Sequence, residues 1–257
     1  MLEQLDKRQR VRRISETIGE VLESHAFGLL IPTDTLSDAL ATRGTTNDRI
    51  RHLFDCDTGS FIYLTVAENL GLRASLVDIT LPSGSGHNYV RWEIGDETMD
   101  WDVNGRYECT TPSSTTTWEG KTMTGAQTKG YSRALRAELF KRRRLYDRAL
   151  VDYREAMRLY PESPLPQNNF AWLVATRFPG HSRLRREALS AATRAVEIRP
   201  DATFLDTLAC VWAALGDFER ATRYSDRAIA KEPGNSDYLQ RREGFRSIPP
   251  RSCAGAD

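Results

Sequence analysis

The sequence predicts two parts of different fold class: an α+β domain in the first half and an all-α solenoid of helix pairs in the second. Helix and strand signals mix up to about residue 128, whereas from residue 129 apolar residues recur almost only at helical spacing. Between the two parts, residues 110–128 are rich in Thr, Ser and Gly, which is typical of a loop or linker. We therefore expect domains at 1–128 and 129–246, followed by a disordered tail at 247–257.

The composition of the 257 residues argues against several classes of protein. Apolar residues make up 40% of the chain and charged residues 28%, which is enough apolar surface for a packed core. The 36 Lys and Arg residues nearly balance the 35 Asp and Glu residues, and the net charge of +1 argues against a nucleic-acid or membrane partner. No stretch reaches the ~18 apolar residues of a membrane-spanning helix, and residues 1–13 carry no recognisable export signal.

The four cysteines (Cys56, Cys109, Cys210 and Cys253) are widely spread, with no CxxC pair and no histidine cluster beside them. This spacing argues against a disulfide framework and against a zinc site, and we expect no metal and no organic cofactor. The simplest compartment for such a chain is the reducing cytoplasm. Of these residues, only Cys56 has a sequence context that indicates chemistry, and Cys210 is expected in the core of a repeat helix.

The first half begins with helices. Apolar residues recur at three- and four-residue steps over residues 5–24, which predicts one amphipathic helix. A short helix is expected between Thr35 and Gly44, since the Thr35 region has capping-box character. The next helix starts at Cys56 and ends at Gly71. It is apolar on nearly every side, so we expect it to be buried in the centre of the domain.

Three strands are expected after that helix, at residues 75–81, 87–93 and 98–103. A two-residue turn at Gly95 and Asp96 would place Ile94 opposite Glu97. Counting outward along the hairpin then places Arg91 opposite Asp100, as an ordinary ion pair. His87 lies diagonal to Asp102, at a distance of about 7 Å, so Asp102 is the better partner for this histidine.

Residues 35–105 resemble the transglutaminase-like cysteine peptidases. The resemblance rests on Cys56 opening a helix that ends at residues 70–72, on Gly86 and His87 starting a strand, and on residues 101–102 in the strand that follows. It implies a papain-like fold, with a central helix packed against an antiparallel sheet. It also implies that Cys56 is the nucleophile, that His87 is the general base and acid, and that Asp102 orients the imidazole.

Two readings of Cys56 stay open at this stage. A thiol at a helix N-terminus is favoured as a thiolate, but free cysteine is also a common core residue. Asp55 and Asp57 flank the thiol; nearby carboxylates raise the pKa of a cysteine, unless they cap the helix amides instead. The other histidines have no cysteine and aspartate in a comparable pattern, and they are interpreted as surface or packing residues: His25, His52 and His181.

The second half resembles the tetratricopeptide family over about residues 130–235. Pro161, Pro200 and Pro233 end successive helix pairs, at intervals of 39 and 33 residues, close to the family period of about 34. Small alanines recur at matching places in the repeats, where paired helices approach closely. About three repeats are expected, with a capping helix near residues 235–245. Trp172 and Trp212 are assigned to repeat packing.

The basic run Lys141–Arg144 ends the leading helix of the first repeat. It is interpreted mainly as a solvated surface with cations near a helix C-terminus, and alternatively as a grip on acidic peptides or phosphates. The main functional hypothesis is a thiol-dependent acyl-transfer enzyme (a peptidase, amidase or transglutaminase-like enzyme) acting on a protein or peptide recruited by the concave face of the repeats. The alternative hypothesis is a non-catalytic adaptor that binds protein partners through the repeats.

Overall fold

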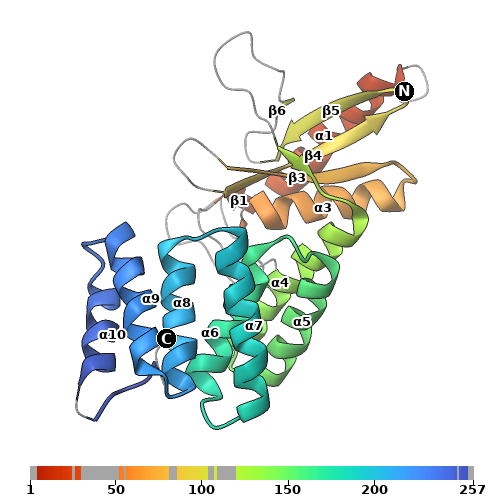
Figure 1. Ribbon diagram of the computed structural model, residues 1–257. Helices are drawn as coiled ribbons and strands as arrows, with labels where there is room; N and C mark the ends of the chain where they lie inside the picture. The colour runs from red at the N-terminus through yellow and green to blue at the C-terminus, as the bar shows by residue number, and fades with distance from the viewer. Residues whose placement is uncertain are drawn as a thin grey trace. The chain divides into compact units, whose positions relative to one another are not determined.

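The chain divides into two compact units, Met1–Thr128 and Lys129–Asp257, each with a hydrophobic core of its own. The structure, a computed structural model, describes residues 5–24, 27–29, 52–54, 56–80, 86–103, 107–108, 120–247 and 249–253. Figure 1 shows strands and helices in the first unit and stacked helices in the second. The short helix predicted from Thr35 lies outside the described residues.

A five-stranded antiparallel sheet forms the body of the first unit, in the order β6-β5-β4-β3-β7. Its strands are β3 (Ala74–Thr80), β4 (Gly86–Ile94), β5 (Glu97–Asp102), β6 (Tyr107–Glu108) and β7 (Lys121–Thr122). A separate parallel pair joins β1 (Phe27–Leu29) to β2 (His52–Phe54). The three strands predicted by alternation are β3, β4 and β5, and the described bounds differ from the predicted ones by one residue.

The β4–β5 hairpin has the predicted register. Ile94 pairs with Glu97 and Arg91 with Asp100. Gly95 in the turn has a φ of 66°, a conformation that glycine adopts without the steric penalty of a Cβ atom. Because the turn has the expected length, the side chains of alternate residues face as predicted.

Two helices cover one face of this sheet: α1 (Lys7–Ser24) and α3 (Cys56–Asn69). They share a core with alternate residues of the strands. Its buried members are Val11, Ile18, Leu22, Tyr63, Ala67, Val90, Trp92, Met99, Trp101 and Val103. The prediction that α3 is buried on nearly every side is wrong, because Thr65, Glu68 and Asn69 are exposed and only one side packs on the sheet. Gly71, with a φ of 65°, follows the helix end as predicted.

The predicted linker at residues 110–128 is wrong for its last part. From Gly120 onward the chain is regular: β7 pairs with β3, and the helix α4 (Gly125–Arg142) begins before residue 128. Gly120 is needed here, because a Cβ atom at this position would come within 2.4 Å of the side chains of Val77 and Ile79. Composition marked this stretch as a loop, but close packing against β3 overrides that preference.

The second unit stacks three helix pairs and a closing helix. The helices are α4 (Gly125–Arg142), α5 (Tyr146–Leu159), α6 (Pro164–Arg177), α7 (Ser182–Ile198), α8 (Ala202–Ala214), α9 (Phe218–Lys231) and α10 (Ser236–Arg246). From α5 to α10, each helix packs on its neighbours in sequence, and α6 also packs on α8. The alanines predicted at close approaches are completely buried: Ala137, Ala149, Ala156, Ala171, Ala188, Ala195, Ala209, Ala221 and Ala228. The structure thus confirms the predicted reason for the repeat spacing.

The prediction of a disordered tail is wrong for residues 249–253. After α10 the backbone N–H of Arg251 donates to the carbonyl of Gly244 at 2.8 Å, and Cys253 forms a disulfide with Cys210 of α8. Both cysteines are buried, and they form one disulfide in a chain whose cysteine spacing argued against a disulfide framework. The two residues are 43 positions apart, with no local pattern to link them.

This disulfide also bears on the expected compartment. The expectation of a reducing cytoplasm rested on unpaired cysteines, and the Cys210–Cys253 bond removes part of that basis. Among the helices that the structure describes, none is both long enough and apolar enough to cross a membrane.

Candidate functional site

The first candidate site begins at Cys56, the first residue of α3. Its side chain is half-buried, and its Sγ lies 4.0 Å from Oδ1 of Asp57. Asp57 in turn accepts a hydrogen bond from the side-chain amide of Asn88 on β4. This contact ties the first turn of α3 to the beginning of β4. Asp57 also lies in the first turn of α3, where a carboxylate complements the positive end of the helix dipole.

His87 and Asp102 meet across β4 and β5. Nε2 of His87 lies 3.2 Å from Oδ2 of Asp102, and the two residues are only 9% and 5% exposed. The pair joins residues that are 15 positions apart, in the diagonal arrangement predicted from the hairpin register. Since Nε2 faces the carboxylate, Nδ1 is the ring nitrogen left to exchange a proton with a thiol.

The surroundings of His87 favour its charged form. The hydrogen bond to Asp102, followed by one with the thiol of Cys56, raises the pKa of His87 to about 10, although burial acts in the opposite direction. The imidazole therefore carries a proton at neutral pH. A cationic imidazole beside a sulfur atom stabilises the thiolate form of a cysteine.

The thiol and the imidazole meet near the beginning of β4. By strand alternation, His87 shares a face with Tyr89 and Asp102, whereas Val90 and Trp92 lie on the face that α1 and α3 cover. The body of α3 thus packs on one face, and its first turn reaches the end of the strand where His87 stands. Cys56 approaches His87 at this end of the strand.

A second polar group supports the same hairpin. Arg91 donates to both carboxylate oxygens of Asp100, at 2.6 and 2.7 Å, which confirms the predicted ion pair. Arg91 also donates to Thr122 of β7 and to the hydroxyl of Tyr89. Bidentate geometry of this kind fixes the alignment of β4 and β5 beside the candidate site.

Sequence reasoning missed Asn88. It follows the candidate histidine on the strand and is 3% exposed, on the side that faces α3. A polar residue in a run of otherwise apolar inward positions (Asn88, Val90 and Trp92) was the signal that could have identified it.

Among the other histidines, only His181 has a described side chain. His181 is exposed beside Phe178 in the second unit, with ring centroids 5.7 Å apart. His25 and Cys109 lie outside the described residues, and only the backbone of His52 is described. Within the described part of the chain, no group of three His, Cys, Asp or Glu residues is placed to hold a metal ion.

A second candidate site crosses the leading helices of the second unit: α4, α6, α8 and α10. On α4, Glu138 accepts hydrogen bonds from Tyr153 and from Asn169 of α6, the latter at 2.9 Å, and pairs with Lys141 at 2.6 Å. Burial, followed by the charge of Glu138, raises the pKa of Tyr153, so this phenol stays neutral. Three helices are thus linked through one carboxylate.

The row of polar contacts continues to the end of the unit. Arg241 of α10 pairs with Asp206 of α8 at 2.9 Å, and its guanidinium lies 5.5 Å from the ring centroid of Trp172 on α6. Burial raises the pKa of Asp206 to about 6, against the opposing effect of Arg241. We call the group of Glu138, Asn169, Trp172, Asp206 and Arg241 the leading-helix face; Asp206 is its buried member.

No family model and no curated protein matches the chain. Among solved structures, it is similar to the first tetratricopeptide domain of Spaghetti (RPAP3) bound to an HSP90 peptide, with 17% identity over 49% of this chain and 96% of that chain (TM-score 0.43). It is also similar to the second such domain of human RPAP3 in complex with an HSP70 peptide, with 18% identity over 48% of this chain and 99% of that chain (TM-score 0.43). A third similar structure is the tetratricopeptide domain of Arabidopsis OM64, with 16% identity over 48% of this chain and 98% of that chain (TM-score 0.42).

The stacked helix pairs themselves decide the architecture of this half. The C-terminal unit is a solenoid of stacked helix pairs. It accounts for about half of the chain. We call this unit the solenoid and the first unit the sheet unit.

Proposed function

We propose that the chain binds a protein or peptide partner on the leading-helix face of the solenoid. The observation that supports this function is the continuous row of charged, amide and aromatic groups across four successive leading helices. Apolar packing would suffice to hold these helices together. A bound peptide, in contrast, needs hydrogen-bonding groups for its backbone and aromatic surface for its side chains.

The test is a selection of displayed random peptides on the full-length chain. Replacing Trp172 by Leu should lower the affinity for the selected peptides by about tenfold, because an aromatic anchor contributes a large share of peptide affinity. The matched control is Trp212→Leu, which removes an indole that packs under Arg220 instead of lying beside Arg241. Equal loss in both variants would contradict the assignment of the face.

A second candidate function is thiol-dependent acyl transfer at Cys56, His87 and Asp102. The observation that favours it is the buried His87–Asp102 hydrogen bond beside a cysteine at a helix N-terminus. It agrees with the resemblance to the transglutaminase-like cysteine peptidases and with the papain-like fold which that resemblance implies. On this proposal, the substrate is an amide or peptide of a partner held by the solenoid.

The proposed reaction begins with the pair of Cys56 and His87. The thiolate of Cys56 attacks the acyl carbon, and amides of the first turn of α3 stabilise the oxyanion. The tetrahedral intermediate collapses as the amide C–N bond breaks, and the imidazolium of His87 gives its proton to the leaving amine. The neutral imidazole then takes a proton from water or from a second amine, which attacks the thioester and releases Cys56. Asp102 holds the imidazole in place throughout.

Alkylation of the full-length chain by iodoacetamide tests the second function. At about pH 6, Cys56 should react at least about tenfold faster in the wild type than in His87→Ala, because a paired imidazolium favours the thiolate. His181→Ala serves as the control. If Cys56 reacts at the same rate in all three proteins, the acyl-transfer proposal fails, and the adaptor function remains.

A further inference from the structure

The disulfide of the solenoid lies on the same side of the helix stack as the leading-helix face. Trp172 and Cys210 directly follow the matching buried alanines of two repeats, Ala171 and Ala209. Since α6 packs on α8, matching places on these two helices lie on one surface. Trp172 belongs to the leading-helix face, so Cys210 is its counterpart on the next leading helix.

Cys210 and Gly244 continue the leading-helix face along α8 and α10. Cys210 comes four residues after Asp206, and Gly244 comes three residues after Arg241. Residues three or four positions apart lie on the same side of a helix. The ion pair of Asp206 with Arg241 and the place between Cys210 and Gly244 are therefore successive turns of one surface.

The tail, residues 249–253, lies over this second turn. The N–H of Arg251 donates to the carbonyl of Gly244 at 2.8 Å, and Cys253 is bonded to Cys210. A Cβ atom at Gly244 would lie 3.8 Å from the Cβ atom of Arg251, at van der Waals distance. Cys210 is completely buried, whereas the matching indole of α6 is partly exposed. The tail thus covers this end of the surface.

The disulfide is the strongest anchor of this cover. Pro249, Pro250 and Arg251 are exposed, so the burial of the tail is mainly that of Cys253. A short segment with three exposed residues buries little surface to offset the entropy lost when it is ordered. A covalent bond to α8 removes most of that cost, and we therefore expect the tail to leave α8 when the bond is broken.

From these observations we propose that the tail is a redox-controlled cover, which closes the α8–α10 end of the leading-helix face while Cys210 and Cys253 are bonded. The inference rests on the proposed binding of a peptide to this face, and it adds the regulation of that binding. A peptide that continues from Trp172 toward α8 meets the tail at Cys210. The tail and the peptide compete for this place, and reduction of the disulfide opens it to the peptide.

Opening the cover consumes a dithiol reductant. Both cysteines are buried, so the attack follows a local opening of the tail. A thiolate of the dithiol attacks one sulfur atom, the S–S bond breaks, and the other cysteine leaves as a thiolate that takes up a proton. The second thiol of the dithiol then attacks the mixed disulfide and releases the remaining cysteine. The two cysteines gain two electrons and two protons, and the reductant leaves as a disulfide.

The test compares peptide binding by the oxidised and the reduced full-length chain. The peptides are selected from a displayed random library on the full-length Cys253→Ser variant, and fluorescence anisotropy measures their dissociation constants. The wild type should bind them about tenfold more tightly after reduction by dithiothreitol, a coupling of ordinary size between two sites. The matched control is Cys253→Ser, which cannot form the bond and should bind equally with and without dithiothreitol.

The same coupling must appear in the redox equilibrium. A saturating peptide should shift the ratio of reduced to oxidised chain by the same factor of about ten, because the coupling is reciprocal. Buffers of reduced and oxidised dithiothreitol set the equilibrium, and iodoacetamide with mass spectrometry counts the thiols of Cys210 and Cys253. If circular dichroism shows that the reduced chain unfolds, both measurements are repeated in trimethylamine N-oxide, which favours the folded state.

Three results would overturn the proposal. Equal affinity of the oxidised and reduced chains would mean that the tail does not obstruct the peptide, and the proposed binding function would stand without the cover. Tighter binding by the oxidised chain would make the tail a part of the binding surface. Binding by neither form would count against the leading-helix face itself, and the cover would then have nothing to regulate.

Discussion

The solenoid and the sheet unit differ in how far apart in the sequence their contacting residues lie. In the solenoid, alanines recur at matching repeat positions, and helices that are adjacent in sequence pack together, as α8 and α9 do. In the sheet unit, the site joins residues that are far apart: Asn88 contacts Asp57 across 31 positions, and His87 contacts Asp102 across 15. A repeated sequence pattern allows the structure of the solenoid to be predicted. A site built across strands can be predicted only if the turn between the strands sets the expected register.

The largest effect expected from this comparison concerns the one long-range covalent link of the solenoid's described residues. Replacing Cys253 by Ser opens a loop closed across 43 positions and should destabilise the solenoid by about 4 kcal/mol, since the unfolded chain regains the freedom that the disulfide removes. The measurement is urea unfolding followed by the ¹⁹F signals of fluorotryptophan. Trp172 and Trp212 report on the solenoid, and Trp92 and Trp101 report on the sheet unit.

Only the solenoid signals should move to lower urea concentration. Reduced wild-type protein should match the Cys253→Ser variant, and Cys56→Ser should leave the solenoid signals in place. An equal shift of all four signals would mean that the two units unfold together, and the comparison between them would lose its basis.

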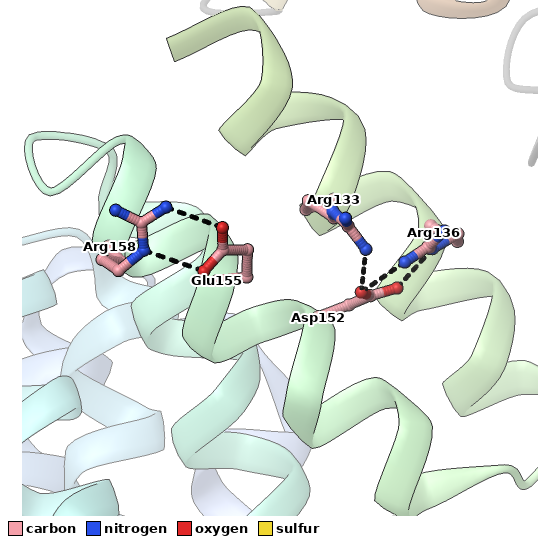
Figure 2. A network of polar contacts seen from close by, with 5 residues as sticks. All are labelled: Arg133, Arg136, Asp152, Glu155 and Arg158. Atoms are coloured by element: carbon pink, nitrogen blue, oxygen red, sulfur yellow. Dashed lines mark hydrogen bonds and ion pairs between the residues drawn. The ribbon is translucent and has the colours of Figure 1, made fainter. Parts of the chain in front are cut away.

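The next largest loss of stability is expected from a substitution in the first helix pair, α4 and α5. Figure 2 shows Asp152 of α5 accepting hydrogen bonds from Arg133 and Arg136 of α4. The hydrogen bonds are 2.5 to 3.0 Å long, and the side chain of Asp152 is only 2% exposed. Although burial acts to raise it, these guanidinium groups hold the pKa of Asp152 below its usual range. Asp152→Ala should cost about 3 kcal/mol, because it removes a buried carboxylate that accepts three charge-assisted hydrogen bonds from partly exposed arginines of the neighbouring helix.

The same figure contains the matched control. Arg158 and Glu155 form an ion pair within one turn of α5, with the arginine side chain 66% exposed. Glu155→Ala should leave the urea midpoint nearly unchanged, because water screens such a pair. If both alanine variants shift the urea midpoint equally, burial is not what makes the Asp152 network strong.

The sequence predicted the two kinds of region to different depths. The ends of the helix pairs follow from Pro161, Pro200 and Pro233, and the β4–β5 register follows from a turn at Gly95 and Asp96. What the sequence did not predict depends on distant partners. Cys253 pairs with Cys210 with no local signal, and β7 forms in a stretch whose composition favours a loop, because it fits beside β3 at Gly120.

The candidate site shows the same limit. The order of Cys56, His87 and Asp102 suggested that they meet, and the hairpin register selected Asp102 over Asp100 as the partner of His87. The contact between Asn88 and Asp57 was not predictable, because it depends on where the first turn of α3 lies along β4. No periodic pattern in a sequence indicates which side chain of a helix contacts which side chain of a strand.

A smaller effect is expected from the protonation of His87. Its pKa rises from the ordinary 6.5 to about 10 through the hydrogen bonds to Asp102 and Cys56. A raised pKa means that the stabilisation is complete below about pH 6.5 and is lost as the pH rises through about 10. The sheet unit should therefore lose on the order of 2 kcal/mol over this window.

The signals of Trp92 and Trp101 measure this loss as a falling urea midpoint from about pH 6.5 to about pH 9.5. His87→Gln should have a lower midpoint near neutral pH and little dependence on pH over the same window. The solenoid signals of the wild type give an internal comparison, since Asp206 titrates at about 6, below that range. A flat wild-type profile for the sheet unit would contradict the charged state of His87.

The smallest effect concerns the closing helix of the solenoid. The side chain of Asn235 accepts hydrogen bonds from the N–H groups of Asp237 and Tyr238, at 3.1 and 3.3 Å, so Asn235→Ala should cost about 1 kcal/mol. Ser163→Ala is the control, because Ser163 precedes α6 without a capping hydrogen bond from its side chain. Hydrogen exchange of the α10 amides measures the loss. Since the tail is bonded to Cys210, the cap and the disulfide hold opposite ends of α10. The loss should be larger in the Cys253→Ser background, and strictly additive effects would show that the two anchors act independently.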